Sequence, residues 1–367
     1  MEDIKKINPW ESFEVKDYDK LSKDFGIESF SNILKKVPNP HLYMRRGFIF
    51  GHKDFNKIIE AINKKQDFAM LTGLMPSGKF HLGHKTIADQ MIYYQELGAE
   101  CYITIADIEA YLTRNLTHKE MYETAVNEYL INYIALGLKP KKTHVYFQSE
   151  GSKDYMNLSK YVSKKITLNE MKAIYGDLNP GKIISVFTQI ADILHPQLEE
   201  NGGPKPVIVP IGIDQLPHAN LSRDIASRMS DEYKFILPSF TFNKFIPSLQ
   251  GGKMSSSIKE SYIALTDNPK EVENKIKKYA FSGGRETIEE HRKKGGNPDV
   301  DVSYQYLTFF EKDDKKLKQI YDDYKSGKIL TSELKQITID TINTFLKEHQ
   351  KNREKARSQI DKFIYKK

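Results

Sequence analysis

The 367-residue sequence predicts an α/β fold: a doubly wound parallel sheet, with an N-terminal extension before it and an all-α region after it. Two observations predict this class. Short apolar runs alternate with helical patterns at spacings of about thirty residues, which is typical of parallel strands joined by crossover helices. From Asn268 the pattern changes to charged helices without strand candidates. We therefore expect an N-terminal extension over residues 1–65, an α/β domain over 66–265 and a helical domain over 266–367.

The composition limits the class of protein. No stretch approaches the roughly 20 apolar residues of a membrane-spanning helix, and Met1–Asn8 lacks the apolar core of a signal peptide. The one cysteine, Cys101, excludes a disulfide framework and a Cys-rich zinc site, so we expect no protein-bound zinc. These features predict a soluble, cytoplasmic protein. Lysine and arginine exceed aspartate and glutamate by 56 to 49, an excess that fits an anionic partner without requiring one.

The N-terminal extension is the least regular part of the sequence. Residues Trp10–Val15 alternate apolar and polar side chains, which predicts an exposed strand in a small hairpin. Further on, residues 43–52 bring two arginines close to Phe48 and Phe50.

The central region carries strand and helix signals in alternation. A helical pattern begins at Gly83, and a capping box, Thr117–Glu120, begins another helix that runs through Tyr133. A third helical pattern starts at Asp214. The short apolar runs that we expect as strands are 68–71, 101–105, 143–147 and 206–210. Because helices separate these strands, they should pair in parallel and form a Rossmann-like sheet.

The turn after the first of these strands contains part of a phosphate-binding loop. Gly73–Lys79 fits the pattern G-x-x-x-x-G-K, but a working loop continues with Ser or Thr, whose hydroxyl holds magnesium. Here the next residue is Phe80. The sequence therefore argues against a phosphate-loop ATPase.

The motif His81-Leu82-Gly83-His84 follows directly, where the turn opens a helix at the carboxyl edge of the first strand. Ligands of open α/β sheets bind at this edge, and the amino end of a helix favours phosphate. Gly83 lets a nucleotide approach the backbone, and the histidines can donate hydrogen bonds to phosphate oxygens that gain charge. Alone, the motif fits a helix cap or surface histidines equally well. A zinc site here would lack a third ligand at suitable spacing.

A second motif lies far downstream, in Gly251–Ser257. Its glycines, its three serines and Lys253 predict a loop that can close over a polyphosphate, with lysine as a point charge and the hydroxyls as neutral donors. Alone, such a stretch is more typical of a polar linker. Its combination with His81–His84 favours an ATP site.

Together the two motifs resemble the HIGH and KMSKS signatures of class I aminoacyl-tRNA synthetases, in the same order along the chain. The departures are Leu82 in the first motif and, in the second, Ser256 in place of the usual second lysine. Residues 280–292 and 299–310 resemble the stretches after the second signature in tryptophanyl-tRNA synthetases of the archaeal and eukaryotic type.

The resemblance implies a reaction in two steps. Tryptophan attacks the α-phosphate of ATP to give tryptophanyl-adenylate and pyrophosphate, and the amino acid is then transferred to tRNA(Trp). Such a reaction needs positioning and charge stabilisation rather than a covalent nucleophile, and the resemblance assigns these roles to His81, His84 and Lys253. Mg²⁺ would accompany ATP, held mainly by phosphates and water. The residues that the resemblance assigns to ATP binding are Gly73, Pro76, Gly83, Met254, Ser255 and Ser256.

The resemblance also assigns the tryptophan pocket to Glu109, Gln189 and Gln215. Without it, a capping glutamate and two surface glutamines would be the more usual interpretation. Two positions depart from the relatives. Leu71 stands where eukaryotic relatives usually carry a tyrosine that helps to hold the indole nitrogen, and Thr104 stands where glutamine is frequent. Gln215 or another group must then do more of the work of holding the indole N–H.

The implied partners are tryptophan, ATP and tRNA(Trp), and relatives act as homodimers through the α/β domain. The helical domain would bind the anticodon, although Tyr304 and Tyr306, which could stack on bases, have the spacing of core residues. Two other functions remain open. One is a tyrosyl-tRNA synthetase of the same fold, and the other is a non-catalytic RNA-binding protein, which would not need both ATP motifs.

Overall fold

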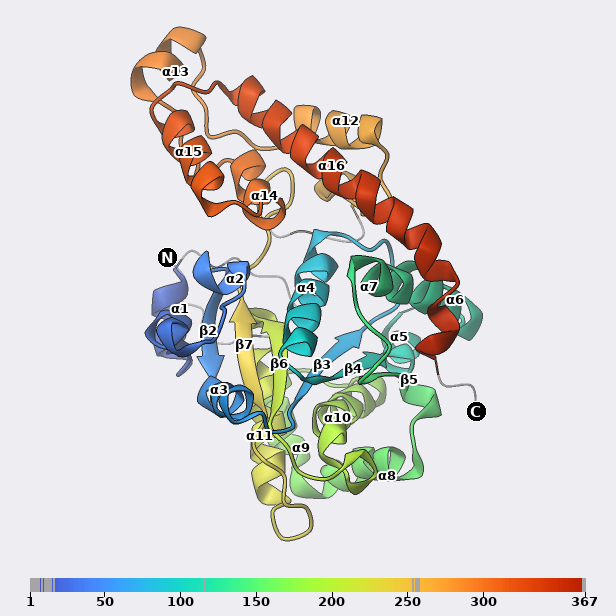
Figure 1. The fold of residues 1–367 in the computed structure, drawn as a ribbon. Helices are drawn as coiled ribbons and strands as arrows, with labels where there is room; N and C mark the ends of the chain where they lie inside the picture. The colour runs from blue at the N-terminus through green and yellow to red at the C-terminus, as the bar shows by residue number, and fades with distance from the viewer. Residues whose placement is uncertain are drawn as a thin grey trace. The chain divides into compact units, whose positions relative to one another are not determined.

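The structure is a computed structural model that describes residues 7, 9, 15, 17–114, 116–252, 254 and 258–364. The chain forms two compact units (Figure 1). Unit 1 comprises residues 1–77, 87–244 and 357–367, and unit 2 comprises residues 78–86 and 245–356. These units are defined by contacts and do not follow the expected segments 1–65, 66–265 and 266–367, which remain predictions.

Unit 1 is built on one mixed sheet. Its strands are β1 (Glu28–Ser29), β2 (Ile49–Lys53), β3 (Ala69–Leu74), β4 (Glu100–Ile105), β5 (Thr143–Phe147), β6 (Val207–Gly212) and β7 (Ser239–Asn243). They lie in the order β1-β2-β7-β6-β3-β4-β5. Neighbours from β7 to β5 are parallel, whereas β2 is antiparallel to both β1 and β7. The predicted doubly wound α/β fold is confirmed, with an antiparallel edge.

Local sequence signals begin several helices of unit 1. Thr117 and Thr167 each form a capping box, the first as predicted, and Asn179 caps a helix that has Pro180 at its first position. The helices are α1 (Tyr18–Asp24), α2 (Leu42–Arg45), α3 (Phe55–Lys64), α4 (Leu82–Glu96), α5 (Asp107–Thr113), α6 (His118–Thr124), α7 (Ile131–Leu136), α8 (Lys153–Tyr161), α9 (Leu168–Tyr175), α10 (Pro180–Leu194) and α11 (Leu216–Arg228). The first residues of α4 belong to unit 2.

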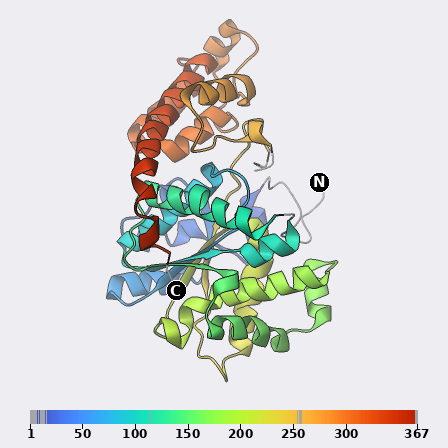
Figure 2. The same ribbon diagram turned by 90° about the vertical axis from the view of Figure 1, so that its right-hand side faces the viewer.

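The chain leaves the centre of the sheet in two directions. After β3 it moves outward through β4 to β5, and after β6 it moves the other way to β7. Because parallel crossovers are right-handed, the two directions place their helices on opposite faces. Figure 2 shows α6–α7 and α8–α10 on opposite sides of the strands. The order reverses between the neighbours β3 and β6, where open α/β sheets bind their ligands.

The four predicted strands are present as β3, β4, β5 and β6. Three others were not predicted. The sequence of β2 shows no clear alternation of apolar and polar residues, because it contains Gly51 and two basic residues. Its pairing with β7 also shifts register between Ile49 and Gly51. β1 has two residues, and β7 is a short buried run. The predicted hairpin strand at Trp10–Val15 lies, apart from Val15, outside the described residues.

Unit 2 is helical. Its helices are α12 (Pro269–Tyr279), α13 (Ile288–Lys294), α14 (Val302–Phe310), α15 (Asp314–Lys325) and α16 (Thr331–Arg357). Leu307, Leu317, Ile320, Tyr324 and Leu334 form one core cluster. Between Asn268 and Ile364, a stretch that the structure describes throughout, no strand occurs, as predicted. Tyr306 is fully buried, as its spacing predicts. No helix in the described ranges is long and apolar enough to cross a membrane.

Candidate active site

A cavity of about 240 Å³ lies in unit 1, where the strand order of the sheet reverses. The carboxyl halves of β3 and β6 and the helices α10 and α11 enclose it, as expected for the ligand site of an open α/β sheet. Its wall is largely apolar. The polar and predicted residues in the wall are Leu71, Thr72, Gly73, Gln189, Asp192, Gln215 and His218.

Two of the predicted tryptophan ligands meet in this cavity. Gln189 lies within α10, and Gln215 ends the 3₁₀ turn Ile213–Gln215 that leads into α11. The Gln189 side-chain Nε2 donates a hydrogen bond to Gln215 Oε1 at 3.3 Å. Because each carboxamide has both donor and acceptor groups, this bond orients the pair and leaves further groups with which to bind a ligand.

Asp192 is a cavity residue that the sequence patterns did not predict. It is buried on α10, three residues after Gln189. Its Oδ1 accepts hydrogen bonds from the hydroxyls of Tyr155 (2.7 Å) and Tyr146 (3.3 Å), and its Oδ2 accepts one from Gln148 Nε2 (2.7 Å). Burial raises the pKa of Asp192 to about 7, although these hydrogen bonds lower it. The i, i+3 spacing from Gln189 is the signal that could have identified it.

Glu109 lies beside this network and not in the wall of the cavity. Its backbone N–H donates to Gln148 Oε1 at 3.2 Å, and the same glutamine holds Asp192. Burial raises the pKa of Glu109, while a hydrogen bond with Ser185 lowers it. The structure therefore brings Glu109 close to Asp192, and its charge contributes to the raised pKa of that residue.

Both departures from the relatives lie at or beside this cavity. Leu71 is 2% exposed and lines the cavity with a side chain that has no hydrogen-bonding group. Thr104 Oγ1 donates to the Tyr146 hydroxyl at 2.6 Å, and Tyr146 in turn donates to Asp192. Thr104 thus supports, through Tyr146, the buried carboxyl of Asp192. That carboxyl can accept a hydrogen bond, which the Leu71 side chain cannot. The predicted ATP residue Gly73 borders the same cavity, and Pro76 is buried in the turn after β3.

The predicted His81–His84 segment opens α4 and belongs to unit 2. The two imidazole rings stack with their centroids 4.0 Å apart, and the Tyr262 ring lies 4.9 Å from that of His81. The Gly83 backbone N–H donates to His81 Nδ1 at 3.1 Å, and the His81 backbone N–H donates to His84 Nδ1 at 3.2 Å. Because each Nδ1 is an acceptor, this network places the ring proton on Nε2.

Burial keeps both imidazoles neutral. It lowers the pKa of His81 to about 4, and it lowers the pKa of His84 well below its usual value, with a smaller contribution from His81. At neutral pH each ring is therefore an uncharged Nε2–H donor. Such preorganised donors suit phosphate oxygens that gain charge in a transition state.

The packing of His81 requires glycine at position 83. A Cβ atom there would lie 2.9 Å from His81 Cε1 and 3.1 Å from His81 Nδ1, which is closer than ordinary van der Waals contact. The sequence predicts Gly83 as a residue that lets a nucleotide approach the backbone. Room for the His81 ring is a second reason for glycine at this position.

Contacts within unit 2 hold this segment in place. The Leu265 N–H donates to the Phe80 carbonyl at 2.9 Å. In the first turn of α4 the buried Lys85 lies against the rings of Phe310 and Phe345, with Nζ 5.4 and 5.1 Å from their centroids. The histidine pair is therefore tied to α14 and α16.

The second motif is described only in part. Gly251 and Gly252 have φ values of +85° and +70°, which glycine adopts readily, and the Ser248 N–H donates to the Gly252 carbonyl at 2.9 Å. Met254 is half-buried. The predicted residues of this motif that lie outside the described part of the chain are Lys253, Ser255 and Ser256. Among the residues that are described, no three His, Cys, Asp or Glu side chains gather as a metal site.

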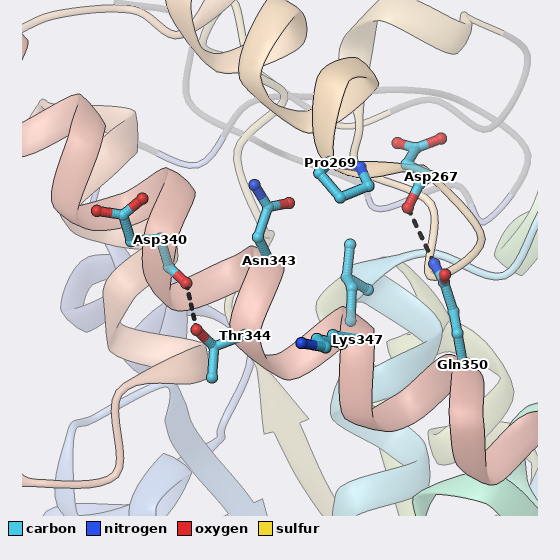
Figure 3. Close-up of a pocket in the computed structure, with 8 residues that line it drawn as sticks. Asp267, Pro269, Asp340, Asn343, Thr344, Lys347 and Gln350 are labelled. Atoms are coloured by element: carbon cyan, nitrogen blue, oxygen red, sulfur yellow. Dashed lines mark hydrogen bonds between the residues drawn. The ribbon is translucent and has the colours of Figure 1, made fainter.

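A second cavity, of about 530 Å³, lies in unit 2 between the start of α12 and the middle of α16 (Figure 3). Its charged lining residues are Asp267, Asp340 and Lys347. Gln350 Nε2 donates to the Asp267 carbonyl at 2.9 Å, and both residues line the cavity (Figure 3). None of the predicted site residues line it.

Comparison with known proteins places the chain in a family. Residues 63–347 match the tRNA synthetases class I (W and Y). The chain is 46% identical to the tryptophan–tRNA ligase of Aeropyrum pernix and 45% identical to that of Hyperthermus butylicus, in each case over 98% of both chains. The crystal structure of the tryptophanyl-tRNA synthetase from A. pernix matches with a TM-score of 0.90 at 46% identity, covering 96% of this chain and 98% of that one. The chain therefore belongs to the class I tRNA synthetases, on their tryptophanyl branch.

Proposed function

We propose that the chain acts as a tryptophan–tRNA ligase in two steps. The tryptophan carboxylate attacks the α-phosphorus of ATP, the bond from that phosphorus to the bridging oxygen breaks, and tryptophanyl-adenylate and pyrophosphate form. The adenylate then gives its tryptophanyl group to tRNA(Trp) and releases AMP. The observation that carries this function is the cavity at the reversal of the strand order, in which Gln189, Asp192 and Gln215 meet.

The cavity supplies what an indole side chain needs. Its apolar wall, which includes Leu71, suits the rings, and the buried Asp192 is its strongest acceptor. Asp192 Oδ2 accepts one hydrogen bond from Gln148, so it has capacity for the indole N–H. A buried group that pairs with a substrate N–H rejects analogues that lack it far better than an apolar wall does. Gln189, Gln215 and Glu109 are the proposed ligands of the α-ammonium group and of the indole edge.

The phosphates of ATP are assigned to the two sequence motifs. The Nε2–H groups of His81 and His84 donate to phosphate oxygens, and Lys253 adds the positive charge that these neutral rings do not. Ser255 and Ser256 hold the departing pyrophosphate together with Lys253. The proposed ATP contacts along the backbone are Gly73, Pro76, Gly83 and Met254. Mg²⁺ enters with ATP and is held mainly by phosphates and water.

The helices within residues 266–367 are the proposed binding surface for the anticodon of tRNA(Trp), in keeping with their many lysines.

A homodimer through the α/β domain is proposed as the working form. Tyr111 and Leu112 of α5 and Ile184 of α10 are 57, 36 and 48% exposed, and these two helices pack together. Such an apolar patch on a soluble domain is typical of a protein interface. The proposed location of the enzyme is the cytoplasm.

ATP–pyrophosphate exchange tests the function directly. The purified chain should exchange labelled pyrophosphate into ATP when L-tryptophan is present, and it should then charge tRNA(Trp). Parallel reactions with L-tyrosine, or with no amino acid, serve as controls. Exchange that is driven by tyrosine alone would establish the tyrosyl alternative. The absence of exchange with any amino acid, combined with RNA binding, would establish the non-catalytic one.

A further inference from the structure

The helix that follows α5 contains a π-helical turn. Residues Ala125–Leu130 form this turn between α6 and α7. A π turn closes hydrogen bonds from residue i to residue i+5, so it accommodates one extra residue, and such turns are frequent at functional sites. The buried Asn132 donates from Nδ2 to the Glu128 carbonyl, a backbone acceptor within the altered ladder.

Tyr129 lies in this π turn and contacts the segment that follows β3. Tyr129 is 1% exposed, and its hydroxyl donates to the Ser77 carbonyl at 2.5 Å. Tyr129 therefore holds the segment that follows β3 at the Ser77 carbonyl.

Ser77 occupies a special place in the chain. It is the last residue of unit 1 before the chain enters unit 2, and the next residue, Gly78, has a φ of +73°. The Ser77 N–H donates to the Met75 carbonyl at 2.8 Å, so both backbone polar groups of Ser77 are held within unit 1. Four residues later stands His81, the first of the two histidines.

We propose that Tyr129 is a positioning residue for the activation of tryptophan by ATP. By holding the Ser77 carbonyl, its hydroxyl fixes the point from which the segment with His81 and His84 begins. The proposal rests on the function proposed for these two histidines. Because neither Tyr129 nor Ser77 lines the cavity proposed for tryptophan, loss of the hydroxyl should impair the use of ATP and leave the binding of tryptophan nearly unchanged.

The variant Tyr129→Phe tests this role, since it removes the hydroxyl and keeps the ring. Tyr93→Phe is a matched control: Tyr93 is another buried tyrosine of unit 1 whose hydroxyl donates to a backbone carbonyl, that of Pro38, at 3.3 Å. We expect kcat/KM for ATP in pyrophosphate exchange to fall roughly tenfold to a hundredfold in Tyr129→Phe, because small misplacements in a reacting complex have effects of this size. The Kd for tryptophan should stay within about twofold, and Tyr93→Phe should match the wild type in both.

The controls separate positioning from stability. Thermal unfolding of both variants shows how much each lost hydroxyl stabilises the fold. Equal losses of kcat/KM in the two variants, or equal losses for ATP and for tryptophan in Tyr129→Phe, would overturn the positioning role. Unchanged exchange in Tyr129→Phe would also overturn the positioning role. If the wild type is active in that experiment, the proposed function is unaffected. A wild-type chain without tryptophan-dependent exchange would overturn both.

Discussion

In the cavity proposed for tryptophan in unit 1 and in the histidine pair of unit 2, burial shifts pKa values in opposite directions. In the cavity, burial raises the pKa of Asp192 to about 7. In the pair, burial lowers the pKa of His81 to about 4. Both shifts favour the uncharged form of the side chain. The first disfavours the Asp192 carboxylate, and the second disfavours a protonated His81. The cavity therefore offers mainly acceptors for N–H groups, and the histidine pair offers neutral donors for phosphate oxygens.

The positive charge that the reaction needs must therefore come from another group. Neutral imidazoles stabilise a developing anion through hydrogen bonds, but they do not balance the charge of departing pyrophosphate. Lys253 is the charged residue of the second motif. Changes to the charge, to a neutral donor, to the space around that donor and to the acceptor should each impair the reaction, with progressively smaller effects on its rate.

Removal of the charge should have the largest effect. We expect Lys253→Ala to slow pyrophosphate exchange by roughly a hundredfold to a thousandfold, the range seen when a group that stabilises transition-state charge is deleted. The Kd for tryptophan should change little, because the cavity lies on other elements. Lys259→Ala, which removes an exposed lysine six residues later, is the control. Unchanged exchange in Lys253→Ala would contradict the role of this lysine.

Removal of a neutral donor should have the next largest effect. His81→Ala should slow exchange by roughly a hundredfold, and His81→Gln, which keeps a donor, should slow it less. Because the pKa of His81 is about 4, the ring stays neutral above pH 5.5, so its loss should not change the shape of the pH–rate profile from there to pH 8. A wild-type ionisation near pH 6.5 that disappears in His81→Gln would show that a charged imidazole acts instead.

Sequence patterns predicted the strands that are buried on both faces. β3, β4 and β6 are nearly continuous apolar runs between helical patterns, and such runs are typical of parallel strands. The edge was harder to predict, because β2 contains a register shift and β1 has only two residues. β1 pairs with β2, and β2 pairs with β7, which comes almost 200 residues after β2 in the chain. A pairing over that distance leaves no local signal in the sequence.

The candidate site shows the same limit. Gln189 and Gln215 were predicted by resemblance, and the cavity contains both. Asp192 was not predicted, because its partners Tyr146, Gln148 and Tyr155 precede it by 37–46 residues, on or after β5 and on α8. Sequence spacing does not show which distant hydroxyls will surround a carboxylate.

The division of the chain into compact units also has no local signal. The sequence places His81 directly after the first strand of the α/β region, whereas its contacts place it with the helices of unit 2. The cause is packing, which includes the contact of the His81 ring with Tyr262 and the position of Lys85 against Phe310 and Phe345. Hydrophobic periodicity predicts that a helix is amphipathic, but it does not predict which partner covers its first turn.

Filling the space that Gly83 leaves for the His81 ring should have an intermediate effect on the rate of pyrophosphate exchange. In Gly83→Ala the new Cβ would meet His81 Cε1 at 2.9 Å, so the ring must shift. We expect pyrophosphate exchange to fall roughly tenfold. The melting temperature should change little, because alanine favours a helix over glycine by about 1 kcal/mol and offsets part of the strain. Gly181→Ala, in the first turn of α10, adds a Cβ at ordinary contact distances of 3.4–3.6 Å and is the control. A Gly83→Ala variant with wild-type exchange would show that the His81 ring needs no fixed position.

Removal of the charge on the acceptor should have the smallest effect on rate. Because the pKa of Asp192 is about 7, its carboxyl is ionised above that pH and protonated below it. We expect the KM for tryptophan to rise a few-fold as pH falls from 8 to 6, since a protonated carboxyl is a weaker acceptor. In Asp192→Asn, which keeps the shape and an acceptor oxygen, the KM should not vary with pH in this window. The KM for ATP, measured on the same samples, should follow neither trend.

The stability of the fold should increase as pH falls, whereas the binding of tryptophan should weaken. These opposite trends make the Asp192 experiment decisive. A carboxyl whose pKa rises from 3.8 to about 7 on folding stabilises the fold fully below pH 4, and this contribution disappears as pH rises through 7. The difference corresponds to at most about 4 kcal/mol. The wild type should therefore lose melting temperature relative to Asp192→Asn between pH 4 and pH 8. If the two melting curves stay parallel over this range, Asp192 is ionised throughout, and the cavity holds a full negative charge, unlike the neutral histidine pair.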